Sequence, residues 1–82
     1  MELTELKKAN RIVVHVFETD INNREGIEAI APTMNAIDSV IRWSVDTEDV
    51  SNVLRVESFD LESESIIERL NPLGCKVREM PE

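Results

Sequence analysis

Four short stretches of this chain are rich in β-branched and other apolar residues, and two longer stretches repeat apolar residues at helical spacing. The short stretches predict strands. They are residues 11–18, 40–49, 53–58 and 75–80. Because successive side chains of a strand point to opposite faces, alternation predicts which of them enter a core. The inward set predicted for the second and third strands is Ile41, Trp43, Val45, Leu54 and Val56.

The first longer stretch, residues 22–37, predicts a helix. Its apolar residues recur at spacings of three and four: Ile27, Ile30, Met34 and Ile37. Asn22, followed three residues later by Glu25, predicts the capped start of this helix. Pro32 removes one backbone hydrogen bond and crowds the preceding turn, so we expect a kink there or a helix in two segments.

The second longer stretch, residues 61–70, predicts another helix with one apolar side. NPLG follows it, and Gly74 is suited to the left-handed conformation that ends many helices. The predicted order is therefore β-α-β-β-α-β. That order predicts an α+β ferredoxin-like sandwich: a four-stranded antiparallel sheet, strands one and three central, with both helices on one face. We expect one such domain over residues 11–82, preceded by an N-terminal arm at residues 1–10.

Composition narrows the classes of function. The 82 residues carry one cysteine, 17 acidic residues and a net charge of −8. A lone cysteine excludes an intrachain disulfide, and the absence of a signal-like or long apolar run predicts a cytoplasmic protein. The negative charge repels nucleic acid and anionic membranes, whereas a basic protein is an easier partner. We expect no enzyme activity and no cofactor, because no nucleophile and base are grouped and so small a chain has little room for a substrate cleft.

Three stretches carry a resemblance to a known family: VIRWSVDTEDVSNVLRVES, SESIIERLNPLGCKV, and the first loop with the helix that follows it. Over residues 11–80 they resemble the heavy-metal-associated domain of copper chaperones and metal-transporting ATPases. That family binds soft metal through Met-x-Cys-x-x-Cys in the first loop. Aligned on the apolar stripe of the helix, the resemblance places Ile21 at the methionine, and Asn23 and Gly26 at the two cysteines. Because Cu(I) prefers sulfur, the resemblance implies the fold without the family's metal chemistry.

Two alternatives involve ligands. Cys75 lies in the turn that faces the metal loop in the resembled family, so weak soft-metal binding through this thiol, within one chain or across a dimer, is one of them. The other is an ACT-type domain that senses a small molecule, with Asn22, Asn23 and Gly26 as the first-loop ligand candidates.

The outer face of the predicted sheet is a candidate surface for a protein partner or a homodimer. In the first strand, alternation separates Ile12, Val14 and Val16 from Val13, His15 and Phe17, and we assign the second set to this outer face. The predicted interaction surface consists of Val13, His15, Phe17, Arg42 and Arg55. RNA-recognition domains share this element order, but they use basic surroundings and several aromatic residues that the chain lacks.

Overall fold

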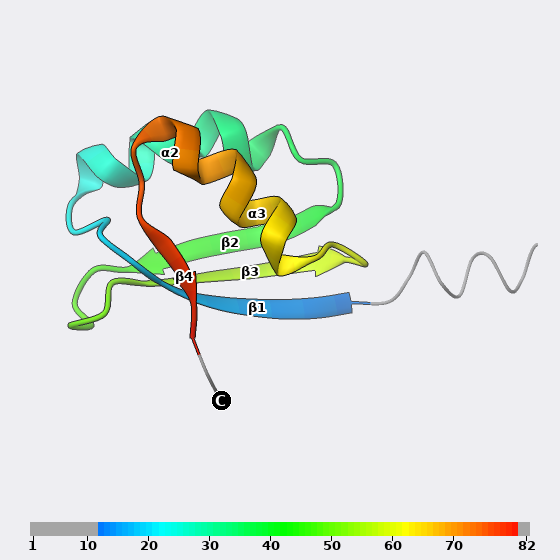
Figure 1. The fold of residues 1–82 in the computed structure, drawn as a ribbon, viewed down its shortest axis with the longest axis horizontal. Helices are drawn as coiled ribbons and strands as arrows, with labels where there is room; N and C mark the ends of the chain where they lie inside the picture. Colours follow the sequence, from blue (N-terminus) through cyan, green and yellow to red (C-terminus); the bar gives the residue numbers. More distant parts are fainter. Residues whose placement is uncertain (1–11, 81–82) are drawn as a thin grey trace, which may run out of the picture.

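The protein forms an antiparallel sheet covered on one face by two helices (Figure 1). The structure, a computed structural model, describes residues 12–80. In chain order its elements are β1 (Ile12–Thr19), α2 (Arg24–Asn35), β2 (Val40–Asp46), β3 (Val53–Phe59), α3 (Ser63–Leu70), the 3-10 turn η1 (Asn71–Leu73) and β4 (Val77–Glu79). The arm predicted at residues 1–10 lies outside the described residues.

The sheet has the strand order β2-β3-β1-β4, and all neighbouring strands are antiparallel. The predicted fold class is confirmed, with strands one and three at the centre. Gly74 has a φ of 84°, and its N–H donates to the Asn71 carbonyl at 2.9 Å. The predicted left-handed turn after the second helix is therefore confirmed.

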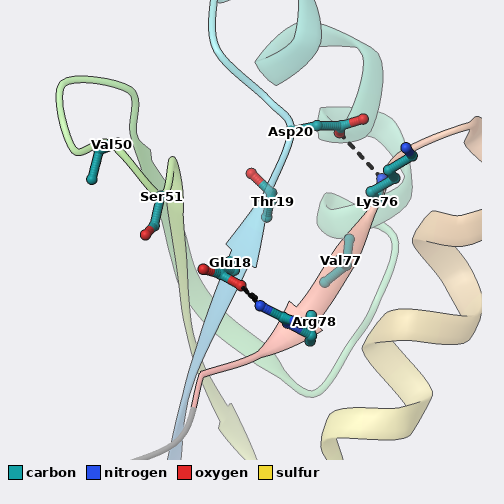
Figure 2. A pocket seen from close by; sticks show the side chains of 8 residues that line it. All are labelled: Glu18, Thr19, Asp20, Val50, Ser51, Lys76, Val77 and Arg78. Carbon is teal, nitrogen blue, oxygen red and sulfur yellow. Dashed lines mark hydrogen bonds and ion pairs between the residues drawn. The ribbon is translucent and has the colours of Figure 1, made fainter.

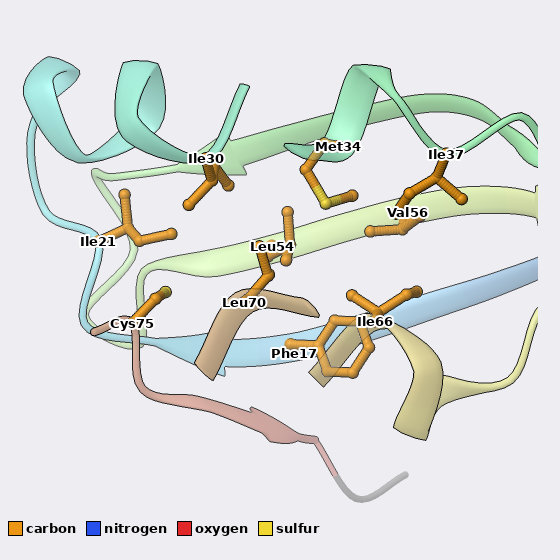
Figure 3. Close-up of a cluster of buried hydrophobic side chains, with 10 residues drawn as sticks. All are labelled: Phe17, Ile21, Ile30, Met34, Ile37, Leu54, Val56, Ile66, Leu70 and Cys75. Carbon is orange, nitrogen blue, oxygen red and sulfur yellow. The ribbon is translucent and has the colours of Figure 1, made fainter. Parts of the chain in front are cut away.

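The core lies between the sheet and the helices (Figure 3). Its buried apolar side chains are Phe17, Ile21, Ile30, Met34, Ile37, Leu54, Val56, Ile66, Leu70 and Cys75. Leu54 and Val56 point inward as predicted. Trp43 and Val45 are partly buried against this core, and the Trp43 indole N–H donates to Asn35 Oδ1 at 2.9 Å. One edge of the helical layer is thereby tied to β2.

The predicted inner and outer sides of β1 were reversed. His15 and Phe17 are 5% and 0% exposed, whereas Ile12 and Val14 are 58% and 46% exposed. Phe17 lies opposite Leu54 of β3, and His15 lies opposite Val56. Directly opposed residues share a face of the sheet, so Val13, His15 and Phe17 lie on the helix side. Burial of the phenyl ring is the largest apolar gain available to this strand.

Three further local predictions were wrong. The register of β2 shifts between Val40 and Arg42, so Val40 packs against the core while Ile41 is 40% exposed. A bulge of this kind inserts one extra residue and moves side chains off the simple alternation. In α2, the N-cap is Asn23 rather than Asn22. Of the two outcomes expected at Pro32, a kink or a helix in two segments, the second is wrong, because α2 continues through Pro32 as one segment.

Candidate functional site

The first loop ends where Asn23 caps α2. Its side-chain Oδ1 accepts a hydrogen bond from the Gly26 N–H at 2.9 Å, and its carbonyl accepts one from the Ile27 N–H at 3.2 Å. The first bond satisfies one of the backbone donors that a helix start leaves free, and the second is the first i→i−4 bond of the helix itself. The amide of Asn23 is therefore occupied by the backbone of its own helix.

Gly26 allows the helix start to approach the loop closely. A Cβ atom added to Gly26 would lie 3.0 Å from Cγ2 of Ile21, closer than such carbon atoms normally come. Ile21 itself is buried in the core. The three positions that the resemblance matched to a methionine and two cysteines thus serve packing and helix capping here.

Cys75 belongs to the same end of the molecule as the first loop. Asp20 joins the two segments: its Oδ1 accepts from the Lys76 N–H at 3.1 Å, and its N–H donates to the Lys76 carbonyl at 3.3 Å. The Cys75 side chain is 9% exposed and forms part of the core near Ile21 (Figure 3). Burial, together with the negative charge of Asp20, raises the pKa of the thiol to about 11. Cys75 is therefore protonated at neutral pH, and the thiolate, the form that binds soft metals, is scarce.

The described residues offer no ready-made metal cluster. Among residues 12–80, no group of three or more His, Cys, Asp or Glu side chains is placed to hold a metal ion. Asn22 is exposed beside the N-cap and outside the core. The structure thus brings Asn23, Gly26 and Cys75 to one end of the fold, each engaged in capping or packing.

A hollow of about 520 Å³ lies beside the first loop (Figure 2). Its lining residues are Glu18, Thr19, Asp20, Val50, Ser51, Lys76, Val77 and Arg78. Arg78 Nε donates to Glu18 Oε1 at 3.0 Å, and the Thr19 hydroxyl donates to the Asn52 carbonyl at 2.7 Å. Its volume suits a small ligand. The first-loop ligand candidates from the sequence, Asn22, Asn23 and Gly26, are not among its lining residues.

His15 is the centre of a buried polar network that the sequence interpretation missed. Its Nδ1 lies 3.0 Å from Ser63 Oγ, and its Nε2 lies 3.3 Å from Ser58 Oγ. The Ser63 hydroxyl donates to Glu79 Oε2 at 3.1 Å. Because that hydroxyl has only one proton, which it gives to Glu79, it accepts from His15 Nδ1–H. Ser58 is 0% exposed and Ser63 is half-buried, and this chain of hydrogen bonds joins α3 to the sheet.

The signal for this network was present in strand three. Ser58 has the same parity as Leu54 and Val56, which were predicted to point inward. A hydroxyl buried at that position needs a hydrogen-bond partner, and the single histidine of the opposite strand can provide one.

Comparison with known proteins places the fold. No family model and no curated protein matches the sequence. Five chains of solved structures match the fold, and two of them are similar over most of this chain. One, described as "CsoZ metallochaperone", has a TM-score of 0.69 and 16% identity, covering 82% of this chain and 97% of its own. The other is the apo form of the HMA domain of copper chaperone for superoxide dismutase, with a TM-score of 0.73 and 14% identity, covering 87% of this chain and 69% of its own.

The class of fold follows from these matches and from the topology above. The chain has the heavy-metal-associated, ferredoxin-like fold, and the resemblance stated from the sequence is confirmed at that level. None of the helices in the described part of the chain is long and apolar enough to cross a membrane.

Proposed function

We propose that this chain is a non-catalytic interaction domain: a heavy-metal-associated fold that contacts other proteins and lacks the family's two-thiolate site. The observation that carries the proposal is the use of the first loop. Asn23 Oδ1 accepts from the Gly26 N–H, and Gly26 packs against Ile21. An amide oxygen and a glycine are not ligands for Cu(I). Without a metal site in the first loop, the domain would bind its partners through the rest of its surface.

The partner class follows from charge. With a net charge of −8, the chain is suited to protein partners and unsuited to nucleic acid or anionic membranes. Localisation in the cytoplasm is part of the proposal, and its support is the single cysteine, which forms no intrachain disulfide. The proposed function includes no enzyme activity. The Ser58 and His15 side chains, which could serve as nucleophile and base, are buried beneath α3 and do not line a cleft.

A titration with metal tests the proposal. Cu(I) under reducing, oxygen-free conditions, and separately Zn(II), is added to the isotope-labelled chain while backbone amide shifts are followed. We expect no stoichiometric change in the amides of residues 20–26 or of Cys75. Tight, one-to-one shifts in that loop would overturn the proposal, and their loss in Cys75→Ser would assign the metal to the thiol.

The hollow beside Asp20 favours a second candidate, the sensing of a small molecule. It joins the first loop to the β2–β3 hairpin, and Lys76 is among its lining residues. Under this candidate, a panel of amino acids and related metabolites shifts the amides of Thr19, Ser51 and Lys76. Unchanged amides at millimolar ligand would rule it out.

A further inference from the structure

The outer face of the sheet, opposite the helices, bears an exposed apolar patch. Ile12 of β1 lies directly opposite Phe59 of β3, and Val14 follows Ile12 on the same face. Ile12, Val14 and Phe59 are 58%, 46% and 36% exposed. We call these three residues the sheet patch; Ile41, exposed by the bulge, lies on the neighbouring strand β2. Figure 1 shows both helices on the opposite side of the sheet.

The charges of this face differ from those of the rest of the molecule. By alternation and register it carries three bases and three acids: Arg42, Arg55, Arg78, Glu18, Asp46 and Glu57. Two pairs of these neutralise each other, since Arg42 Nε lies 3.3 Å from Glu57 Oε1 and Arg78 is bonded to Glu18. The remainder of residues 12–80 holds eleven acids and only three bases. The outer face is thus formally neutral and partly apolar on an otherwise strongly acidic body.

We propose that a second copy of this chain covers the outer face, so that two sheets pack face to face about a two-fold axis. This proposal deepens the interaction function above and rests on it. Two bodies that each carry −8 repel one another, and the neutral face is where they approach at the lowest electrostatic cost. A two-fold contact also places the same patch on both sides, so apolar residues meet apolar residues.

The size of the face predicts a weak dimer. Three strands of seven or eight residues span roughly 25 Å by 14 Å, or about 350 Å² per copy, from the standard strand rise and spacing. A standard stable interface buries about 800 Å² per partner. Because interfaces this small are those of weak, transient encounters, we expect a reversible dimer that is populated only at high protein concentration.

Sedimentation equilibrium of the full chain between about 10 µM and 1 mM tests the proposal, because dimer populations follow mass action. The expected result is a monomer–dimer equilibrium that tightens as NaCl is raised, since salt screens the repulsion between the acidic bodies. Val14→Glu should weaken the dimer about tenfold or more, because it places two like charges in the contact. Val50→Glu is the matched control, since Val50 is 95% exposed on the β2–β3 hairpin, outside the patch, and it should leave the equilibrium unchanged.

A monomer at every concentration, with wild-type amide shifts of Val14 and Phe59 independent of concentration, would overturn the proposal. This result is obtained with the wild-type chain, so it does not depend on whether a variant folds. If residues 1–10 cover the face instead, the chain is monomeric and Leu3→Ser/Leu6→Ser shifts the amides of the sheet patch, which also overturns it. None of these results involves the first loop, so they test the dimer independently of the metal titration that tests the proposed function.

Discussion

Single side chains decide what the first loop can do. Asn23, Gly26 and Ile21 are the residues that the family resemblance matches to the two cysteines and the methionine of a soft-metal site, and each has a defined structural role. The contacts are local and specific: one side-chain hydrogen bond at the helix start and one close carbon–carbon approach. Their consequences can be measured residue by residue.

The N-cap assignment predicts a difference between two adjacent asparagines. Asn23→Ala removes the acceptor of the Gly26 N–H and should lower the free energy of unfolding by about 1 kcal/mol. Asn22→Ala, the matched control at an exposed neighbour, should change it by less than about 0.5 kcal/mol. Urea unfolding followed by circular dichroism measures both. Equal losses in the two variants would contradict the observed cap.

The buried thiol predicts a distinct pH dependence. Because the pKa of Cys75 is raised to about 11 from an ordinary 9.0, its thiolate fraction near pH 8 falls, and alkylation should be about 100-fold slower than in the unfolded chain. Folding favours the protonated thiol, so this stabilisation is complete below pH 9 and is lost as the pH rises toward 11. Cys75→Ala should lack that loss, as alkaline unfolding curves would show. Rapid alkylation of the native chain at pH 8 would argue against a buried thiol.

At the scale of the elements, the sequence pattern was sufficient for the order of helices and strands and for the central position of β1 and β3. The side of β1 that faces the core was not predictable from the sequence. Five of the six residues from 12 to 17 are apolar, so the two alternating sets of side chains look equally suited to the core. Only the register against Leu54 and Val56 decides it, and a register is a property of two strands together. The bulge at Ile41 likewise depends on how β2 pairs with β3, and the sequence of β2 alone does not reveal it.

The observed orientation of β1 predicts that substitutions of the adjacent residues Phe17 and Val16 differ in their effect on stability. Phe17→Ala should cost about 3–5 kcal/mol, because it opens a cavity at a fully buried position. Val16→Ala, on the opposite face, should cost roughly 1 kcal/mol or less. Denaturant midpoints compare the two. A larger loss for Val16 would restore the orientation expected from the sequence.

At the scale of the whole molecule, the fold matches metallochaperone domains at TM-scores of 0.69 and 0.73 although identity is only 16% and 14%. Many different sequences can fill an apolar layer such as the one between this sheet and its helices, so the same fold at low identity is expected. The candidate site does not follow from the fold, because function depends on particular side chains placed on it. In this chain, the core under the helices is a general feature of the fold, whereas the side chains of the first loop and of the outer sheet face are particular to this sequence.

The central claim, that the chain keeps the fold without the soft-metal site, is tested most directly by competition for Cu(I) against a coloured chelator. The wild type is compared with Ile21→Met/Asn23→Cys/Gly26→Cys, in which methionine also replaces the isoleucine that would crowd a Cβ at position 26. We predict that the triple variant withdraws one equivalent of Cu(I) from the chelator and that the wild type withdraws none, because only the variant offers two thiolates in the loop. A wild type that competes as well as the variant would contradict the account.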